Sequence, residues 1–507
     1  MTLTEARTHG PGQGNLCDML LAAAGDRPAV IDGGSVVTYS ELTSRAMGIA
    51  GTLLERGVRP GERVAILNRR GADAAAAFYG VLASGAIAVL VNELLRPRQI
   101  EYVLDHSGAS VLLVEQAILD RLPRPLGTEA TVVVRDALAP SSNVEPVPRE
   151  RDDVAQIVYT SGSTGQPKGV TLSHGNLWAG TEAVVSYLGL TGRDRIASLL
   201  PFSFDYGLNQ LLCSVATGAS LVMERSPVAA RIVRTLRDQE VSVVSGVPPL
   251  WHQLLQVEAF QGEPLPALRT MTNSGGRLPV ESVQQLRACQ PQAELVLMYG
   301  LTEAFRSTYL PPDRVDAKPG AIGRAIPGAE VFVIDDDGLP CKPGEVGEPV
   351  HRGPTVALGY WRDPEATARV YRPNPLRPWG ARDAERVVYS GDLAYRDEDG
   401  DLFFVGREDA LIKTLGYRVS PDEVADVLYA SGEIVEAVVS SEPDEVRGAR
   451  IVAHVVLAEH GELERLEAFA AEELPRFMQP SRIEVRAGIE RTASGKYDTA
   501  ATAHGTT

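Results

Sequence analysis

The stretch IVYTSGSTGQPKGV, residues 157–170, carries the clearest signal in the chain, because an apolar strand-like run enters a loop rich in glycine, serine and threonine. Glycines turn tightly and expose backbone N–H groups, the hydroxyls donate further hydrogen bonds, and Lys168 supplies positive charge. The loop is not a Walker A motif, because Pro167 precedes the lysine and no Gly-Lys-Ser/Thr sequence occurs there. We interpret it as a phosphate-binding loop, with a flexible Gly/Ser loop as the alternative.

Strand-like and helix-like segments alternate on both sides of this loop. The strand-like runs are residues 63–67, 86–91, 110–114 and 131–135 before it and 220–224, 241–247 and 294–300 after it. Ala/Leu-rich stretches with the length of helices occupy residues 71–84 and 98–108. This alternation predicts a parallel, doubly wound sheet in the first third of the chain and a second α/β layer after the loop.

The last part of the chain has a different sequence pattern. From about Pro319, short strand-like runs are separated by Gly-Pro turns, which predicts an irregular β barrel. After Gly406 the pattern is that of a compact α+β module. Its predicted helices are residues 419–430 and 463–474, and its predicted strands are residues 436–440 and 450–458.

The predicted fold class is therefore α/β. We expect a large N-terminal body, residues 1–408, built from two doubly wound α/β subdomains plus the irregular β barrel. A small, mobile α+β C-terminal domain, residues 409–507, follows it.

The composition is that of a soluble globular protein, with 44% hydrophobic and 23% charged residues in a chain of 507. Lys and Arg number 49 against 66 Asp and Glu, and the resulting net charge of −17 argues against nucleic acid or a membrane as a partner. The widely separated Cys17, Cys213, Cys289 and Cys341 argue against a disulfide scaffold. The N-terminus has no signal-peptide core, and we interpret the apolar run 74–91 as a buried helix followed by a buried strand. We expect a cytoplasmic protein.

Five further motifs follow the loop in order along the chain. They are NSGGRLP (273–279), MYGLTEA (298–304), YSGDLAYRDEDGDLFFVGRED (389–409), IKTLGYRVSPDEV (412–424) and RTASGKYD (491–498). With the loop, they resemble the adenylate-forming superfamily of acyl- and aryl-coenzyme A ligases, peptide-synthetase adenylation domains and luciferases. This resemblance implies that a substrate carboxylate attacks the α-phosphorus of ATP, releasing pyrophosphate and leaving an acyl-adenylate that a thiol then attacks.

The resemblance also implies which residues bind ATP. Tyr299 matches the aromatic residue that stacks on adenine, and Asp392, with Arg407 beside it, matches the carboxylate that accepts both ribose hydroxyls. Thr302 matches the hydroxyl that contacts the α-phosphate. The implied ATP contacts are Thr160, Ser161, Gly162, Ser163, Thr164, Gly165, Lys168, Ser274, Gly275, Gly276, Arg277, Met298, Tyr299, Gly300, Thr302, Asp392, Arg407 and Lys496.

A metal ion and a catalytic lysine are implied in the same way. Glu303, with Thr164 nearby, matches the carboxylate that holds Mg²⁺, a hard ion that prefers oxygen ligands. Lys496, in ASGK, matches the catalytic lysine of the C-terminal domain, and we expect it to act with Lys168, Thr302 and Glu303 on the phosphate charge.

The family's hinge matches Asp409. In this resemblance the C-terminal domain swings about the hinge after adenylation, withdraws the lysine and presents another face near Lys413 and Gly416. One position departs from the family pattern, because Glu490 stands where a proline usually precedes the Arg-Thr pair. That departure concerns the local turn and leaves the expectation for the lysine unchanged.

The acyl pocket is predicted from LPFSFDYGLNQLL, residues 200–212, where many acyl-coenzyme A ligases carry a histidine. Its Phe204-Asp205 pair resembles amino-acid-activating domains, in which the aspartate pairs with the substrate ammonium. A buried carboxylate needs a cationic partner, so the alternative is an internal ion pair between Asp205 and Arg306. The implied pocket residues are Asp205, Tyr206, Asn209, Gly246, Thr272, Ser274, Met298, Phe305, Arg306 and Ser307.

The sequence of this predicted pocket resembles two subgroups of the family. Asp205, Ser274 and Arg306 together resemble stand-alone β-amino acid adenylating enzymes of macrolactam polyketide pathways, where Arg306 would bind a second carboxylate or close the pocket. The runs FSFDYGLNQ and MYGLTEAFRSTYLPP also resemble acyl-coenzyme A ligases associated with bacterial exopolysaccharide loci. The amine position, α or β, stays open.

No carrier domain or attachment motif follows Lys496, so we expect the thiol to come from a discrete acyl carrier protein or from coenzyme A. Carrier proteins are acidic, so binding one would need a local basic patch, and scattered solvated arginines are the open alternative. The candidates are Arg447, Arg450, Arg476, Arg482 and Arg486. The leading prediction is an amino-acid–carrier-protein ligase. The alternatives are a coenzyme A ligase for a non-amino carboxylic acid, and an adenylate-binding module or luciferase-like oxygenase.

Overall fold

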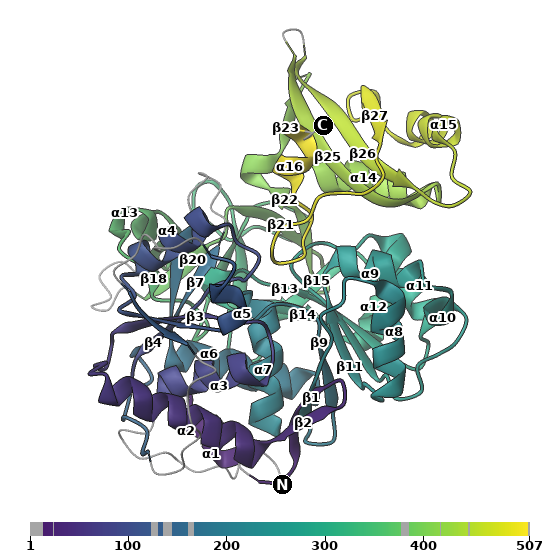
Figure 1. The fold of residues 1–507 in the computed structure, drawn as a ribbon. Helices are drawn as coiled ribbons and strands as arrows, with labels where there is room; N and C mark the ends of the chain where they lie inside the picture. Colours follow the sequence, from purple (N-terminus) through teal and green to yellow (C-terminus); the bar gives the residue numbers. More distant parts are fainter. Residues whose placement is uncertain are drawn as a thin grey trace.

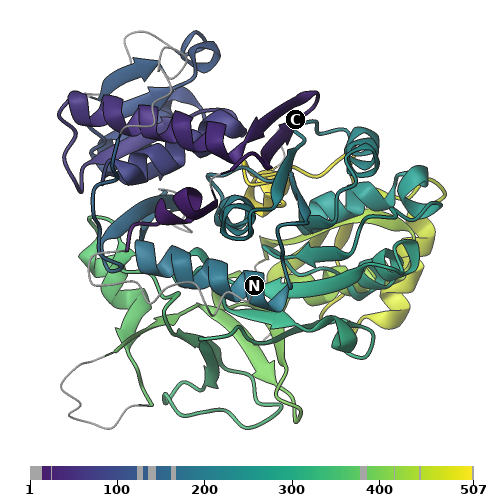
Figure 2. The same cartoon turned by 90° about the horizontal axis from the view of Figure 1, so that it is seen from below.

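Two large mixed sheets form the body of the molecule, and a smaller C-terminal unit lies on top of them (Figure 1). The computed structural model describes residues 14–23, 25–122, 130–134, 144–160, 167–376, 385–415, 417–444 and 447–504. The first helices and the C-terminal unit lie at opposite ends of the molecule in Figure 1, and Figure 2 gives the view from below, from the side of the first helices. The predicted α/β fold with a large N-terminal body and a smaller C-terminal unit is confirmed.

The first sheet has seven strands in the order β18-β8-β7-β4-β3-β5-β6. Their bounds are β3 (Arg63–Leu67), β4 (Ile87–Leu90), β5 (Val111–Val114), β6 (Thr131–Val134), β7 (Val154–Thr160), β8 (Lys168–Ser173) and β18 (Gly359–Tyr360). From β7 to β6 all neighbours are parallel, whereas β8 and β18 pair antiparallel. β4 and β5 are buried on both faces, which explains their continuous apolar sequences.

The second sheet has eleven strands in the order β2-β1-β10-β9-β11-β12-β13-β14-β15-β22-β21. Its parallel part contains β1 (Pro28–Asp32), β10 (Ser220–Met223), β9 (Arg195–Ser198), β11 (Val243–Gly246), β12 (Thr270–Asn273) and β13 (Glu294–Tyr299). Its antiparallel strands are β2 (Ser35–Thr38), β14 (Thr308–Leu310), β15 (Ala321–Ala325), β22 (Leu402–Arg407) and β21 (Asp392–Arg396). The predicted second α/β layer is therefore confirmed.

Helices cover both sheets, and one hydrophobic core joins the two α/β subdomains. The longer ones are α2 (Tyr39–Glu55), α3 (Ala72–Ala83), α4 (Pro97–Ser107), α6 (His174–Tyr187), α7 (Asp205–Thr217), α8 (Ala229–Asp238), α9 (Pro248–Leu255) and α11 (Val280–Cys289). The short ones are α1 (Asp18–Ala23), α5 (Gln116–Leu119), α10 (Glu258–Gln261), η3 (Thr302–Ala304), α12 (Pro312–Val315) and α13 (Pro364–Val370). The apolar run 74–91 is a buried helix and strand, as predicted, and no helix in the described segments could cross a membrane.

The predicted β barrel is wrong. The strands β16 (Glu330–Ile334), β17 (Glu348–Arg352), β20 (Arg386–Tyr389) and β19 (Tyr371–Pro373) form an open four-stranded antiparallel sheet with β16 and β19 at its edges. The strands β14, β15, β21 and β22 extend the eleven-stranded sheet instead. The four strands of the described chain that are left are too few to close a barrel.

The C-terminal unit has its own hydrophobic cluster, separate from the core of the body. It contains η4 (Glu408–Ala410), β23 (Ile412–Thr414), β24 (Tyr417–Val419), α14 (Pro421–Ala430), β25 (Ile434–Asp444), β26 (Gly448–Leu457), α15 (Leu463–Glu473), β27 (Arg482–Val485) and α16 (Thr499–His504). The predicted helices and strands all occur, with small shifts at their ends. The boundary at residue 408 and the mobility of the unit stay predictions.

Candidate active site

The C-terminal unit inserts the loop that carries Lys496 into the body. Asn92 Nδ2 donates to the carbonyl of Ala493 at 3.0 Å, so the body contacts this loop directly. Within the loop, the N–H of Thr492 donates to the carbonyl of Lys496 at 2.8 Å and closes a tight turn. The side chain of Lys496 therefore points into the body from a turn that is fixed at both ends.

Lys496 lies against Phe204 and Gly275. Its Nζ is 4.9 Å from the centre of the Phe204 ring, a cation–π distance. Gly275 has φ +79°, and a Cβ at that position would lie 2.8 Å from Lys496 Cε, so only glycine leaves room for the lysine. Desolvation lowers the pKa of Lys496, and the charge of Asp205 opposes this shift. The predicted catalytic lysine thus reaches the centre of the predicted site.

The predicted ribose and adenine residues lie together. Tyr299, at the end of β13, donates its hydroxyl to Asp392 Oδ2 at 2.5 Å, and Arg407 Nη1 lies 3.6 Å from Asp392 Oδ1. Burial raises the pKa of Asp392 to about 6, against the lowering effects of the Tyr299 hydrogen bond and Arg407. Arg407 Nε also donates to Asp409 at 3.0 Å, which joins this cluster to the predicted hinge.

Arg277 and Gly276 have surroundings that the sequence did not indicate. Arg277 Nη1 pairs with Asp426 Oδ2 on α14 at 2.5 Å, so this predicted nucleotide residue connects the body to the C-terminal unit. Burial raises the pKa of Asp426 to about 6, although Arg277 opposes the shift. A Cβ on Gly276 would lie 3.1 Å from the Pro248 ring, which is a tighter space than most residues accept.

The predicted phosphate and metal residues approach one another at η3. Glu303 Oε1 accepts a hydrogen bond from the Tyr360 hydroxyl at 2.6 Å, and Lys168 Nζ lies 5.3 Å from the centre of the Tyr360 ring. Thr160 faces Lys168 across the β7–β8 hairpin, as adjacent paired strands require. The predicted residues Ser161, Gly162, Ser163, Thr164 and Gly165, with Gly416 of the predicted second face, lie outside the described residues.

The predicted acyl pocket begins at the first residue of α7, Asp205. This side chain is 6% exposed, its Oδ1 accepts from the Tyr206 N–H at 2.7 Å, and its Oδ2 accepts from Thr302 Oγ1 at 3.4 Å. No Lys, Arg or His of the described chain lies within 4.0 Å of the Asp205 carboxylate. The ion pair with Arg306, which we considered as the alternative, is therefore not formed.

Tyr206 and Thr272, two residues of this predicted pocket, are hydrogen-bonded to each other. The Tyr206 hydroxyl donates to the Thr272 carbonyl at 3.0 Å, and Thr272 Oγ1 donates to Ser245 Oγ at 3.0 Å. Met298 Sδ accepts a hydrogen bond from the Tyr187 hydroxyl at 2.9 Å. These three hydrogen bonds fix predicted pocket residues on neighbouring strands and helices.

Three further predicted pocket residues are buried. Asn209 and Ser274 are almost inaccessible, and the amide nitrogen of Asn209 has no described hydrogen-bond partner. Gly246 makes room for Trp251, because a Cβ there would lie 2.7 Å from the indole. Gly246 therefore allows the Trp251 indole to pack closely against the backbone at this predicted pocket residue.

Arg306 is a buried cation without a counterion in the described chain. The residue is 4% exposed, its guanidinium carbon lies 4.8 Å from the centre of the Tyr206 ring, and Nε and Nη2 have no described hydrogen-bond partner. Phe305, with φ +24°, turns the chain between Glu303 and Arg306 and packs against Gly180 of α6. The Ser307 hydroxyl is buried and also lacks a described partner. Arg306 and Ser307 therefore offer hydrogen-bond donors that no described residue of the protein accepts from.

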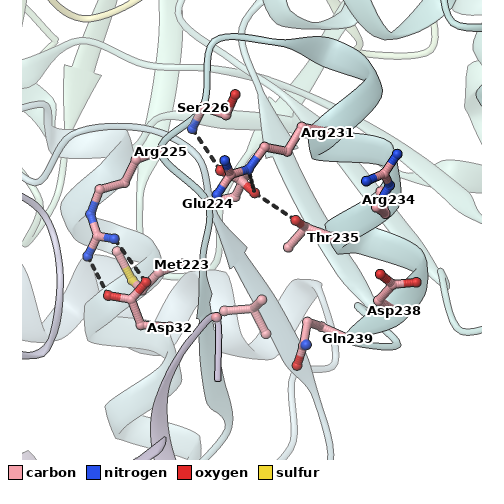
Figure 3. Close-up of a pocket in the computed structure, with 12 residues that line it drawn as sticks. Asp32, Met223, Glu224, Arg225, Ser226, Arg231, Arg234, Thr235, Asp238 and Gln239 are labelled. Carbon is pink, nitrogen blue, oxygen red and sulfur yellow. Dashed lines mark hydrogen bonds and ion pairs between the residues drawn. The ribbon is translucent and has the colours of Figure 1, made fainter. Parts of the chain in front are cut away.

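Two other features resemble binding sites: a hollow lined by charged residues and a cluster of three aspartates. A hollow of about 610 Å³ between β10 and α8 is lined by charged residues, but Arg225 pairs with Asp32, and Glu224 binds Arg231 and Thr235 (Figure 3). Its charges are largely matched internally, so we assign it no role.

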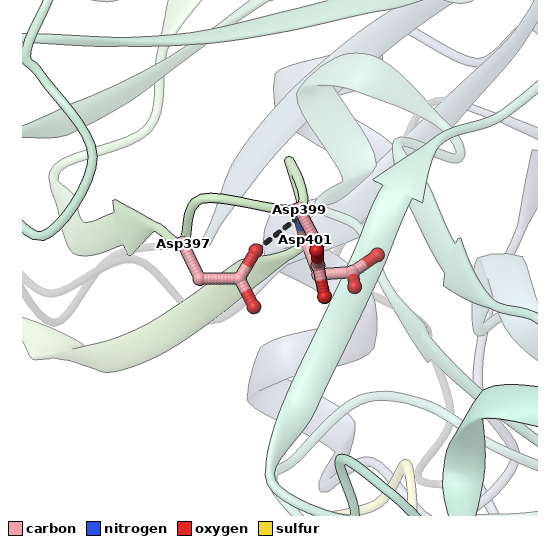
Figure 4. A group of neighbouring side chains, drawn as sticks. All are labelled: Asp397, Asp399 and Asp401. Carbon is pink, nitrogen blue, oxygen red and sulfur yellow. Dashed lines mark hydrogen bonds between the residues drawn. The ribbon is translucent and has the colours of Figure 1, made fainter.

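Asp397, Asp399 and Asp401 lie close together in the β21–β22 turn (Figure 4). The Lys318 ammonium lies 2.6 Å from Asp399 Oδ2 and 2.9 Å from Asp401 Oδ2, and Arg324 also pairs with Asp401. Because the lysine occupies the place that a cation would take, this group is an ion-pair network that ties the turn to β15.

Four residues of the site escaped the sequence analysis: Tyr360 beside Glu303, Asn92 beside the Lys496 loop, and His252 with Tyr429 at the domain interface. Asn92, His252 and Tyr360 come from segments outside the motifs, and Tyr429 lies in the predicted helix 419–430, where no local pattern marks it as an interface residue. Tyr497 directly follows Lys496, the predicted catalytic lysine, in the motif, and only that adjacency was a usable signal.

Comparison with known proteins agrees with this geometry. A family model described as AMP-binding enzyme matches residues 20–361, and one described as AMP-binding enzyme C-terminal domain matches residues 423–496. Novobiocin biosynthesis protein H of Streptomyces niveus is 32% identical over 93% of this chain and 79% of its own length.

Two solved structures have the same fold. The anthranilate CoA ligase AuaEII in complex with anthranoyl-AMP has a TM-score of 0.87 and 26% identity over 98% of this chain and 97% of its own. O-succinylbenzoate coenzyme A synthetase of Bacillus subtilis, in complex with ATP and magnesium ion, has a TM-score of 0.82 and 26% identity over 95% of this chain and 98% of its own.

The fold and the site define an adenylate-forming enzyme, which activates carboxylates with ATP and belongs among the AMP-forming acid–thiol ligases. The chain is a member of the AMP-binding enzyme family.

Proposed function

We propose that this enzyme activates an amino acid that carries a second anionic group, and that it passes the aminoacyl group to the phosphopantetheine thiol of a separate acyl carrier protein. On the resemblance stated above, the substrate is a β-amino acid. The observation that carries the proposal is the buried Asp205 carboxylate, which has no cationic partner within 4.0 Å in the described chain.

The ammonium group of the substrate is the partner that Asp205 requires. A buried carboxylate without a counterion is costly, and a ligand ammonium removes this cost when it binds. Asp205 Oδ1 is engaged by the Tyr206 N–H and Oδ2 only by a long contact from Thr302, so Oδ2 has capacity for a further donor. Thr302 belongs to the predicted α-phosphate site, so an ammonium at Asp205 would place the acid close to the reacting phosphorus.

Arg306 supports a second anionic group on the same substrate. Its guanidinium is buried, stacks on Tyr206 and has unused donors at Nε and Nη2. A guanidinium binds a carboxylate through two parallel hydrogen bonds, which suits these free donors. Aspartate has one ammonium and two carboxylates, and its ammonium is β to one of them, so it is the probe of choice.

ATP fits the residues around Tyr299 and Lys496. In this proposal Asp392 accepts the ribose hydroxyls, Lys496 and Lys168 stabilise charge on the phosphate oxygens, and Thr302 contacts the α-phosphate. Only one oxygen of Glu303 is engaged by Tyr360, so the carboxylate has an oxygen left for Mg²⁺. When bound, Mg²⁺ would neutralise phosphate charge.

A route for the thiol is available beside the Lys496 loop. A cavity of about 460 Å³ is lined by Phe202, Ser203 and residues 491–495. Both amide atoms of Asn68 and Nε of Arg70, which line it too, are buried without described partners. An extended arm with amide groups, such as phosphopantetheine, would supply those hydrogen bonds. Coenzyme A carries the same arm and is the alternative acceptor.

The predicted carrier-binding patch of five arginines has less support than the proposed route for the thiol. Arg450 and Arg482 pair with Glu442, and Arg486 pairs with Glu484. Three of the five arginines are therefore partly neutralised, and the patch stays a prediction.

Pyrophosphate exchange with matched acids tests the proposal. We expect aspartate to support exchange far better than succinate, which lacks the ammonium, or alanine and β-alanine, which lack one carboxylate. Asp205→Asn should lower kcat/KM for aspartate by about two to four orders of magnitude, corresponding to roughly 3–5 kcal/mol for an ammonium buried without its counterion. Its residual activity with succinate should not fall. Equal losses on aspartate and succinate, or a native preference for succinate, would refute the amino acid assignment.

A further inference from the structure

Three polar rings meet where the C-terminal unit contacts the body. His252 on α9 is 4% exposed, and its Nδ1 lies 2.8 Å from the Tyr497 hydroxyl and 3.4 Å from the Tyr429 hydroxyl. On its other side, His252 Nε2 lies 3.1 Å from Ser282 Oγ on α11. Tyr429 belongs to α14, so this one imidazole contacts two separate segments of the C-terminal unit.

The hydrogen bonds of this group form a continuous chain. The Ala437 N–H donates to the Tyr429 hydroxyl at 2.8 Å, and the hydroxyls of Tyr429 and Tyr497 both lie within hydrogen-bond distance of His252 Nδ1. Burial lowers the pKa of His252 to about 3, so the imidazole is neutral and has one donor and one acceptor nitrogen. We assign Nδ1 as the acceptor from the Tyr497 hydroxyl, and the proton of the neutral imidazole then lies on Nε2, which donates to Ser282 Oγ.

The chain ends at the catalytic lysine, because Tyr497 is the next residue after Lys496. The other end of the same turn is held by Asn92, which binds the carbonyl of Ala493. Asn92 thus anchors the loop before the lysine and His252 anchors it after the lysine. A side chain fixed on both sides loses little further freedom when it acts, which is the benefit of positioning.

We propose that His252 is a positioning residue that holds Lys496 in its adenylation position through Tyr497. The contacts to Tyr429 and Tyr497 exist only while the C-terminal unit is docked as described, so His252 would serve the first half-reaction and have no part in thiol transfer. This inference does not depend on which acid is activated.

The test compares His252→Ala with the wild type in pyrophosphate exchange, with the acid that the wild type activates best, and in thioester formation from the synthetic adenylate of that acid. We expect the exchange kcat to fall by about tenfold to a hundredfold with little change in the KM for ATP. Thioester formation should be unchanged. Tyr497→Phe, which keeps the ring and removes the hydroxyl, should change exchange in the same direction. Asn at position 252 keeps one acceptor near Nδ1, so His252→Asn should lose less activity.

Two controls separate positioning from general damage. His252→Ala should cause no further loss in a Lys496→Ala background, because a residue that acts through the lysine has nothing left to position. Amide hydrogen exchange over residues 491–498 should become faster in His252→Ala without any acid bound, and should not change in His460→Ala, which alters an exposed C-terminal histidine. Independent, multiplicative losses with Lys496→Ala, equal losses in both half-reactions, or unchanged hydrogen exchange would overturn the proposal.

Discussion

Lys496→Ala should abolish most adenylation while sparing thiol transfer. The lysine side chain lies between Gly275 and Phe204, close enough to Asp205, Glu303 and Arg407 to be influenced by their charges. Loss of one positioned charge from a preorganised site costs about 10²–10³ in rate, or about 2.7–4 kcal/mol, by comparison with a lost oxyanion-hole donor. The space at Gly275 is too narrow for a guanidinium, so Lys496→Arg should not restore activity.

Pyrophosphate exchange beside single-turnover thioester formation from synthetic aspartyl-adenylate measures both half-reactions. Lys342→Ala, which removes an exposed lysine from the small antiparallel sheet region, is the matched control and should leave both unchanged. A C-terminal unit that withdraws the lysine after adenylation predicts loss in the first assay alone. Equal losses in both assays from a folded Lys496→Ala variant would refute this reasoning.

Three further predictions concern the nucleotide and acyl sites. Arg306→Met should raise the free energy of unfolding by about 1–3 kcal/mol, since it removes a buried charge without a partner. The same variant should lower kcat/KM for aspartate by at least tenfold. Denaturation curves measure the first effect and pyrophosphate-exchange kinetics the second. Asp392 has a raised pKa of about 6, so protonation below pH 6 should weaken ribose binding and raise the KM for ATP, and Asp392→Asn should remove that pH dependence. Gly275→Ala should reduce exchange by about tenfold or more, because its Cβ would fall 2.8 Å from Lys496 Cε, and initial rates at saturating ATP measure this loss.

The α/β layers could be predicted from the sequence because buried parallel strands are continuous apolar runs. Residues 63–67, for example, form β3 with the predicted bounds. The β barrel was wrong for a physical reason: short antiparallel strands separated by Gly-Pro turns look alike whether they close on themselves or extend another sheet. β15 and β22 pair with each other across about eighty residues of chain, and local sequence does not specify such a partner.

The candidate site, like the fold, could be predicted from the sequence only in part. The motifs predicted Tyr299, Asp392 and Lys496 as site residues, because each motif is a short segment with its own chemical pattern. In the structure Tyr299 and Asp392 are hydrogen-bonded, and Lys496 lies close enough to Glu303 and Arg407 to be influenced by their charges. The sequence left open whether Asp205 pairs with Arg306, since two side chains a hundred residues apart can face each other or not. Arg277, which the motif predicts at the nucleotide, pairs with Asp426, a contact between the body and the C-terminal unit that no local pattern encodes.

A single pyrophosphate-exchange panel of aspartate, succinate, alanine, β-alanine, benzoate and a medium-chain fatty acid tests the proposed substrate most directly. The buried Asp205 and Arg306 predict that aspartate, or another acid with an ammonium and a second carboxylate, gives the highest kcat/KM by at least tenfold. Highest activity with benzoate or the fatty acid would contradict the assignment, because neither has a group for either charge.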